Sequence, residues 1–141
     1  MPDKETIREL IRRALGMMKM SYIPYSHFSV GAALLTDSGE IYTGCNIENA
    51  AYSPSVCAER TAFFKAVSEG HTSFRAIAVT GGKEREAKEL CTPCGVCRQV
   101  MMEFCDPETF LVISAISPDE YRVFTLKELL PLGFGPDNLK N

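Results

Sequence analysis

Three cysteines in two short motifs have the residue type and the spacing to bind one metal ion. Cys57 begins the sequence C-A-E-R, and Cys94 and Cys97 form a C-x-x-C pair that follows Pro93. Three thiolate ligands leave a tetrahedral zinc ion with an open fourth position, which a catalytic site needs. We therefore expect one zinc ion per subunit, bound by Cys57, Cys94 and Cys97.

Two charged residues beside the first cysteine fit such a site. Glu59 could move protons at the open position of the metal. Three thiolates and one zinc ion carry a formal charge of −1, which weakens the metal as a Lewis acid. Arg60 follows Cys57 by three residues, so on a helix its guanidinium can donate to the cysteine sulfur and offset this charge. Glu59 and Cys57 lie about 200° apart around a helix, so they can share a site only at a helix end.

The other cysteines leave two alternatives open. Cys91 stands three residues before Cys94 and could complete a closed four-cysteine structural site. A redox-active pair formed by Cys94 and Cys97 is the second alternative, although it would need neither a third cysteine nor a nearby glutamate. Cys45 and Cys105 read as small core residues.

The composition is that of an ordinary globular protein. The chain has 141 residues, of which 45% are hydrophobic and 23% charged, and this length fits a single domain over residues 1–141. The net charge of −3 argues against a broad basic surface for nucleic acid. We find no signal peptide and no apolar run of about 18 residues that would span a membrane. We therefore expect a cytoplasmic protein with reduced thiols and neither a nucleic-acid polymer nor a membrane as partner.

Hydrophobic periodicity and turn residues predict alternating helices and strands. Helices are expected over residues 5–20, 57–69, 94–104 and 126–130, and strands over 28–35, 41–46, 76–79, 110–113 and 121–124. Residues 81–89 read as an exposed, charged excursion. The first two strands form an antiparallel hairpin, whereas strands separated by a helix favour parallel pairing. The expected fold is α/β, with helices on both faces of a mixed, about five-stranded sheet in three α/β/α layers.

Four motifs in sequence order resemble the small, homotetrameric cytidine deaminases that act on free nucleosides. These motifs are Tyr25–Ala33, Gly44–Ala50, Cys57–Ala62 and Pro93–Gln99. The resemblance implies the cytidine deaminase-like fold and zinc-dependent conversion of cytidine and 2′-deoxycytidine to the corresponding uridines, with Glu59 as the catalytic proton carrier.

The resemblance also implies roles for residues around the metal. Phe28 would pack against the pyrimidine, Asn46 and Glu48 would bind the ribose hydroxyls, and Ala58 would contact the substrate. Arg60 and Gln99 would support the cysteine ligands. The alternatives for Phe28 and Glu48 are a core aromatic side chain and a solvated loop acid. A carboxylate at position 48 would repel phosphate, which favours a nucleoside over a nucleotide.

Further implied contacts cross a subunit interface. Ala51, Tyr52 and Phe134 would reach the active sites of neighbouring subunits in a homotetramer. Two alternative functions remain open, namely a zinc deaminase for a modified nucleoside or a single-stranded nucleic acid, and a non-enzymatic zinc-stabilised interaction module. Glu59 distinguishes the interaction module from the enzymes, because a structural zinc site does not need a proton-transferring carboxylate. Cys91 and residues 83–89 depart from the family motifs.

Overall fold

Helices and strands alternate along the chain, as the periodicity predicted. The structure is a computed structural model that describes residues 1–140. Its elements are α1 (Lys4–Met17), η1 (Met18–Met20), β1 (Phe28–Thr36), β2 (Ile41–Cys45), α2 (Ala58–Ser68), β3 (Phe74–Lys83), α3 (Gly95–Phe104), β4 (Leu111–Ser117), β5 (Glu120–Thr125), α4 (Leu126–Leu129) and η2 (Pro136–Leu139). Within these residues, no helix has both the length and the apolar character needed to cross a bilayer.

The five strands form one mixed sheet in the order β2-β1-β3-β4-β5. Strand β1 pairs antiparallel with both β2 and β3. Strand β3 pairs in parallel with β4, and the connection between them passes through α3, as a parallel crossover requires. Strand β5 returns antiparallel to β4. The predicted mixed, five-stranded sheet is confirmed.

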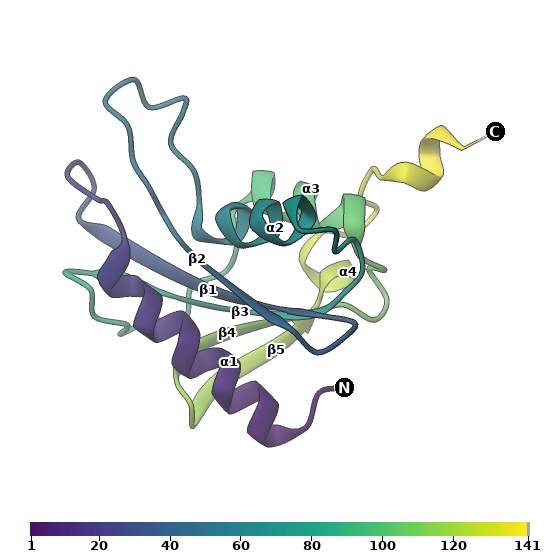
Figure 1. Cartoon of the computed structure of the whole chain (residues 1–141), viewed down its shortest axis with the longest axis horizontal. Helices are drawn as coiled ribbons and strands as arrows, with labels where there is room; N and C mark the ends of the chain where they lie inside the picture. The colour runs from purple at the N-terminus through teal and green to yellow at the C-terminus, as the bar shows by residue number, and fades with distance from the viewer. Residues whose placement is uncertain (141) are drawn as a thin grey trace.

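Helices cover both faces of this sheet, because successive strand residues point to opposite sides. On β1, Ala33 and Leu35 pack in a cluster with α1, whereas Ala32 and Leu34 pack in a cluster with α2 and α3. Figure 1 shows α1 on one side of the sheet and α2 and α3 on the other. Burial on both faces explains why β1 reads as a continuous apolar run. The three-layer α/β/α arrangement is confirmed.

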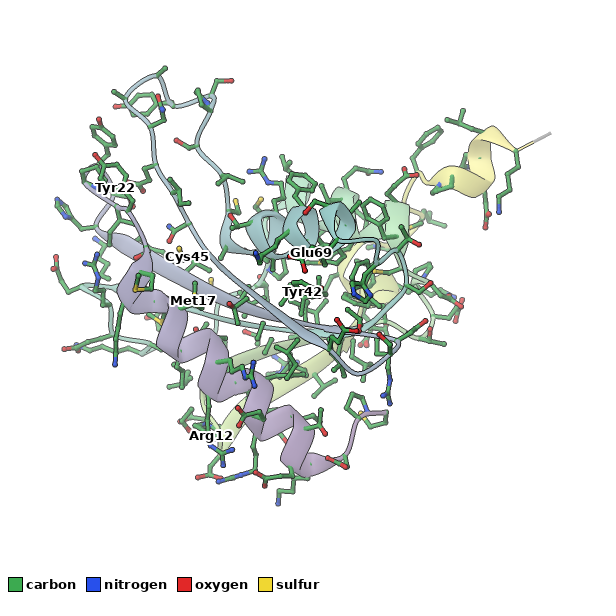
Figure 2. The ribbon with its side chains drawn as sticks, in the orientation of Figure 1. Arg12, Met17, Tyr22, Tyr42, Cys45 and Glu69 are labelled. Carbon is green, nitrogen blue, oxygen red and sulfur yellow. The ribbon has the colours of Figure 1, made fainter. Side chains whose placement is uncertain are left out.

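Polar contacts also tie the helices to the sheet. Tyr42 of β2 lies opposite Glu69 at the C-terminal end of α2 (Figure 2), and its hydroxyl donates to the glutamate Oε1 at 3.1 Å. This contact joins β2 to the end of α2 that lies opposite to Cys57.

Several predicted bounds need correction. Strand β3 was predicted over residues 76–79 but runs from Phe74 to Lys83. The prediction that residues 81–89 form an exposed excursion is therefore wrong for its start, since Gly81 and Gly82 are buried strand residues. Glycine has a low strand propensity, which hid this extension. The first helix ends at Met17 and tightens into the 3-10 turn η1, and the second strand of the first hairpin ends at Cys45.

Candidate active site

The three candidate zinc ligands lie at the N-termini of two helices. Cys57 is the N-cap of α2, Cys94 is the N-cap of α3, and Cys97 lies in the first turn of α3. Free N–H groups and the helix dipole at such ends favour thiolate over thiol. The prediction that two converging helix starts bring these distant cysteines together is confirmed.

The spacing of the sulfur atoms fits a zinc ion. All three Sγ atoms lie within 4.8 Å of one another, and those of Cys57 and Cys94 are 3.7 Å apart. A tetrahedral zinc ion with Zn–S bonds of about 2.3 Å requires a separation of about 3.8 Å. Cys91 is not part of this group. Three cysteines therefore form the metal site within residues 1–140, which argues against the closed four-cysteine alternative.

Arg60 makes the contact that its spacing predicted. Its Nη2 atom donates to Cys57 Sγ at 3.4 Å. The pKa of the Cys57 thiol is lowered to about 5, chiefly by a hydrogen bond from the Cys97 thiol and further by those from Arg60 and Cys94. A cysteine with this pKa is a thiolate at neutral pH and is ready to bind a metal.

Glu59 lies in the first turn of α2, at the helix end where it can share a site with Cys57. Its side chain is only 4% exposed. Burial disfavours the carboxylate and raises the pKa of Glu59 to about 7. A carboxyl group with a pKa near the working pH can both accept and release a proton, as a general acid–base catalyst must.

A glycine in the sheet sets the position of this helix end. At Gly44 of β2, a Cβ atom would overlap the carbonyl oxygen of Ala58 and lie 2.7 Å from the amide nitrogen of Ala62. The first turn of α2 therefore rests directly on the backbone of β2. This close approach fixes the distance between β2 and the first turn of α2, and with it the positions of Cys57 and Glu59.

A cavity of about 340 Å³ connects the metal site to the predicted sugar-binding residues. Its lining includes Cys57, Cys94 and Glu59 together with Asn46 and Glu48. Residues from the segment after β2 and from the starts of two helices therefore meet at one opening. The cavity is of a size to hold a small molecule such as a nucleoside.

The two predicted sugar-binding residues already make hydrogen bonds within the protein. Asn46 Oδ1 accepts from the Val30 amide at 2.9 Å, and Nδ2 donates to the Phe28 carbonyl at 2.8 Å. Glu48 Oε1 accepts from the amides of Tyr25 and Ser26 at 3.0 and 3.1 Å, and its other oxygen accepts from the Ser26 hydroxyl. Glu48 is thus tied to the backbone rather than being a freely solvated acid.

Ser26 is a residue that the sequence analysis did not single out. Its hydroxyl donates to Glu48 and also accepts from the Phe28 amide at 3.0 Å. The available signals were its place in the Tyr25–Ala33 motif and its position two residues before Phe28, a spacing at which a hydroxyl can bond to the backbone. Ser26 therefore links the predicted sugar-binding and base-binding residues.

Phe28 stands at the edge of this arrangement. Its side chain is 36% exposed and lines a second cavity of about 620 Å³, which shares Cys91 with the cavity at the metal site. Phe28 is therefore not a core residue. Its ring faces open space beside the metal site, where an aromatic base could pack.

The remaining candidates lie apart from the cysteine cluster or beneath it. Ala58 is fully buried, so its free helix N-terminal amide is the group that it could offer to a substrate. Tyr52 is 72% exposed in the loop before α2, beside the exposed Ala51. Gln99 is exposed on α3 and donates to the Phe134 carbonyl at 2.8 Å. Among residues 1–140, no hydrogen bond joins Gln99 or Phe134 to the three cysteines.

Arg98 was also missed by the sequence analysis. Its guanidinium donates to the Pro93 carbonyl at 2.7 Å and to the Leu129 carbonyl at 2.6 Å. These bonds fasten the loop that carries Cys94 to the end of α4. The signal was its place directly after Cys97, but the partners become visible only in the fold.

Comparisons with known proteins agree with this geometry. The family model for the cytidine and deoxycytidylate deaminase zinc-binding region matches residues 4–113. A cytidine deaminase of Sporosarcina psychrophila is 46% identical over 133 residues, which cover 94% of each chain. A cytidine deaminase of Halalkalibacterium halodurans is 43% identical over 132 residues, which cover 94% of this chain and 96% of the relative.

Solved structures give the same result. The crystal structure of a cytidine deaminase from Burkholderia pseudomallei matches with a TM-score of 0.80 and 44% identity, covering 89% of this chain and 97% of the other. That of Mycobacterium tuberculosis matches with a TM-score of 0.77 and 36% identity, covering 90% and 95%. With its three cysteines at two helix N-termini and a buried glutamate beside them, this chain belongs to the cytidine and deoxycytidylate deaminase family.

Proposed function

We propose that the chain converts cytidine and 2′-deoxycytidine to uridine and 2′-deoxyuridine by zinc-dependent hydrolysis, with release of ammonia. The observation that carries this proposal is Glu59, a buried carboxyl group with a pKa of about 7 that lines one cavity with Cys57 and Cys94. A structural zinc site would have no use for such a group. The membership in the deaminase family supports the same reaction.

The chemistry is divided between the metal and the protein. A bound zinc ion, held by Cys57, Cys94 and Cys97, would polarise a water molecule and lower its pKa toward neutrality. Glu59 accepts a proton from the water that adds to the ring carbon bearing the amine. It delivers that proton to ring nitrogen N3 and then carries the proton of the added hydroxyl group to the amine, which leaves as ammonia when the carbon–nitrogen bond breaks and the carbonyl group forms. The products are uridine and ammonia.

Arg60 adjusts the charge of this centre. Its hydrogen bond to Cys57 Sγ withdraws electron density from the sulfur. The thiolate then donates less electron density to a bound zinc ion, which would remain a stronger Lewis acid. Without that hydrogen bond, the pKa of a water molecule at the zinc ion would be higher, and Glu59 would remove its proton less easily.

The sugar is recognised by Asn46 and Glu48. An ionised carboxylate has about four acceptor positions, and Glu48 uses three of them on Tyr25 and Ser26. One position is left to accept from a ribose hydroxyl. Asn46 keeps one amide N–H and one lone pair free beside its bonds to Val30 and Phe28. The negative charge on Glu48 disfavours a phosphorylated sugar, so a free nucleoside is the substrate.

The base packs on Phe28, and neighbouring subunits complete the site. Figure 1 shows the segment between β2 and α2 and the C-terminal segment both projecting from the body of the subunit. Tyr52 and Phe134 on these segments are 72% and 58% exposed. Aromatic side chains exposed to this degree are typical of interfaces. We place Ala51, Tyr52 and Phe134 at contacts between subunits of a homotetramer that works in the cytoplasm, in pyrimidine salvage.

The test compares the purified protein with Glu59→Gln in an ultraviolet assay of cytidine deamination. The variant should retain one zinc ion per subunit, measured by mass spectrometry of the metal, and lose at least about a hundredfold in kcat. Cytidine monophosphate should be a poor substrate. A wild-type protein that holds zinc yet leaves both nucleosides unchanged would overturn the proposed substrate.

A further inference from the structure

A tight turn after β3 holds two consecutive residues in left-handed backbone conformations. Glu84 has φ of 54° and Arg85 has φ of 62°, and the Glu86 amide donates to the Lys83 carbonyl at 3.1 Å. This arrangement is a type I′ turn, which usually contains glycine or asparagine. Since neither residue is glycine, the conformation is unfavourable by itself and must be compensated by contacts of the turn.

The chain reverses direction at this turn, and residues 84–90 form no strand. We call residues 83–90 the 83–90 loop. A Cβ atom at Gly82 would overlap the carbonyl oxygen of Glu86, so the returning chain lies directly on β3. The loop therefore covers Gly82, whereas a Cβ atom at Gly81 would meet Cys91 and Phe28. The tip of the loop is held at a fixed place beside the start of β1.

Two hydrogen bonds join the tip to the segment over residues 21–28, which connects η1 to β1. Arg85 Nη2 donates to the Ser21 carbonyl at 2.9 Å, and the Glu84 amide donates to the His27 carbonyl at 3.1 Å. Ser21 is only 5% exposed, and a hydrogen bond from a charged donor is stronger than one between neutral groups. The 83–90 loop thus fastens both ends of the 21–28 segment.

The same segment is held on another side by Glu48. The Glu48 carboxylate accepts from the amides of Tyr25 and Ser26 and from the Ser26 hydroxyl. The backbone of Tyr22, which Figure 2 labels beyond the end of α1, also accepts from the Glu48 amide at 2.9 Å. The 21–28 segment therefore connects Arg85 to Glu48, and it supplies the three hydrogen bonds that orient the Glu48 carboxylate.

We propose that Arg85 is a positioning residue for substrate binding, which acts through the 21–28 segment on the Glu48 carboxylate. The inference rests on the proposed function, in which Glu48 binds the ribose. Without the Arg85 anchor the segment and the carboxylate become less ordered, and substrate binding must then restore that order. The chemical step does not depend on this anchor, because Glu59 and the cysteines are held by α2 and α3.

Two glycine variants separate the guanidinium from the turn. Arg85→Gly removes the side chain but suits the left-handed backbone at that position. Glu84→Gly also places a glycine at a left-handed position of the turn, but it keeps the Arg85 side chain, so it is the matched control. We expect Arg85→Gly to raise the KM for cytidine about three- to tenfold, with kcat within twofold of wild type. Glu84→Gly should leave both constants unchanged within twofold.

A double-variant cycle identifies the route through Glu48. If Arg85 acts by orienting that carboxylate, Arg85→Gly should change KM by less than twofold in a Glu48→Gln protein. If Arg85→Gly raises KM three- to tenfold in the Glu48→Gln protein as well as in wild type, the route through Glu48 is overturned. If Arg85→Gly leaves the KM of the otherwise wild-type protein unchanged, the positioning role is overturned. If wild type does not deaminate cytidine at all, the proposed function falls and the inference falls with it. An active wild type with a normal Arg85→Gly variant contradicts the inference alone.

Discussion

The guanidinium of Arg60 lies one turn along α2 from Cys57 and donates from Nη2 to its Sγ atom at 3.4 Å. The guanidinium belongs to the helix whose N-terminus carries both the metal ligand and Glu59. The three side chains are thus held by one rigid element. Catalysis should respond to the charge of Arg60 even though this residue transfers no proton.

We predict that Arg60→Ala lowers kcat/KM for cytidine about ten- to a hundredfold, the usual cost of losing a hydrogen bond to a metal ligand. The pH–rate profile should shift to higher pH, because the water at the metal becomes less acidic. Activity and zinc content measured across pH would check this. Arg13→Ala is the matched control, because Arg13 lies on α1 and pairs only with Glu9 among the residues described. Full activity with an unchanged pH profile in Arg60→Ala would contradict the role.

Cys91 should be dispensable for zinc. Burial raises the pKa of its thiol to about 11, so it stays protonated at neutral pH, and it lies outside the group formed by the other three cysteines. We predict that Cys91→Ser retains one zinc ion per subunit, whereas Cys94→Ser loses it. Metal analysis of the two purified proteins decides between these outcomes. Loss of zinc from Cys91→Ser would instead support a closed site with four cysteines.

The Glu48 carboxylate should depend on Ser26 for its ionisation. The pKa of Glu48 is lowered, first by the hydrogen bond from the Ser26 hydroxyl and then by the amides of Ser26 and Tyr25. Ser26→Ala should therefore raise this pKa toward the ordinary value, which a carboxyl-carbon NMR titration would measure.

The sign of the effect on stability follows from this shift. A lowered pKa means that the folded protein favours the charged carboxylate, so the Ser26–Glu48 bond stabilises the fold above the ordinary glutamate pKa. That contribution disappears as the pH falls through the lowered pKa. Wild type and Ser26→Ala should thus differ in free energy of unfolding at pH 7 and converge in acid. A constant difference at all pH values would show that the serine acts by packing alone.

The cysteine site could be predicted from sequence because its residues follow local rules. Cys57 and Cys94 each stand directly before an apolar helical pattern, so their position at helix N-termini can be predicted from the local sequence. That α2 and α3 lie on the same face of the sheet depends on the strand order, which the sequence analysis did not predict. The meeting of Cys57 with Cys97 was therefore predicted from the ligand motif, and the fold shows how it comes about.

The proposed sugar-binding region was less predictable, because its hydrogen bonds join residues far apart in the sequence. Nothing near Glu48 indicates that its carboxylate accepts from Tyr25 and Ser26, which lie more than 20 residues earlier. The role of the 83–90 loop could not be predicted for a different reason. Its charged residues resemble a solvated loop, and only the fold shows that the Arg85 guanidinium reaches the Ser21 carbonyl.

The contact between β2 and α2 makes Gly44 sensitive to a single methyl group. A Cβ atom there would overlap the Ala58 carbonyl oxygen, and backbone on both sides leaves no flexible side chain to move away. We predict that Gly44→Ala lowers the free energy of unfolding by about 1–3 kcal/mol, the typical cost of overpacking. Because the first turn of α2 must shift, kcat should fall as well.

Gly16→Ala is the matched control for this substitution. Gly16 lies near the end of α1, is exposed, and has no atom within 4 Å of an added Cβ. Alanine is the better helix former, so this variant should raise the free energy of unfolding by up to about 1 kcal/mol and leave kcat unchanged. Urea denaturation and the deamination assay on both proteins provide the measurement. If Gly44→Ala is as stable and as active as wild type, the close approach of α2 to β2 does not hold Cys57 and Glu59 in place.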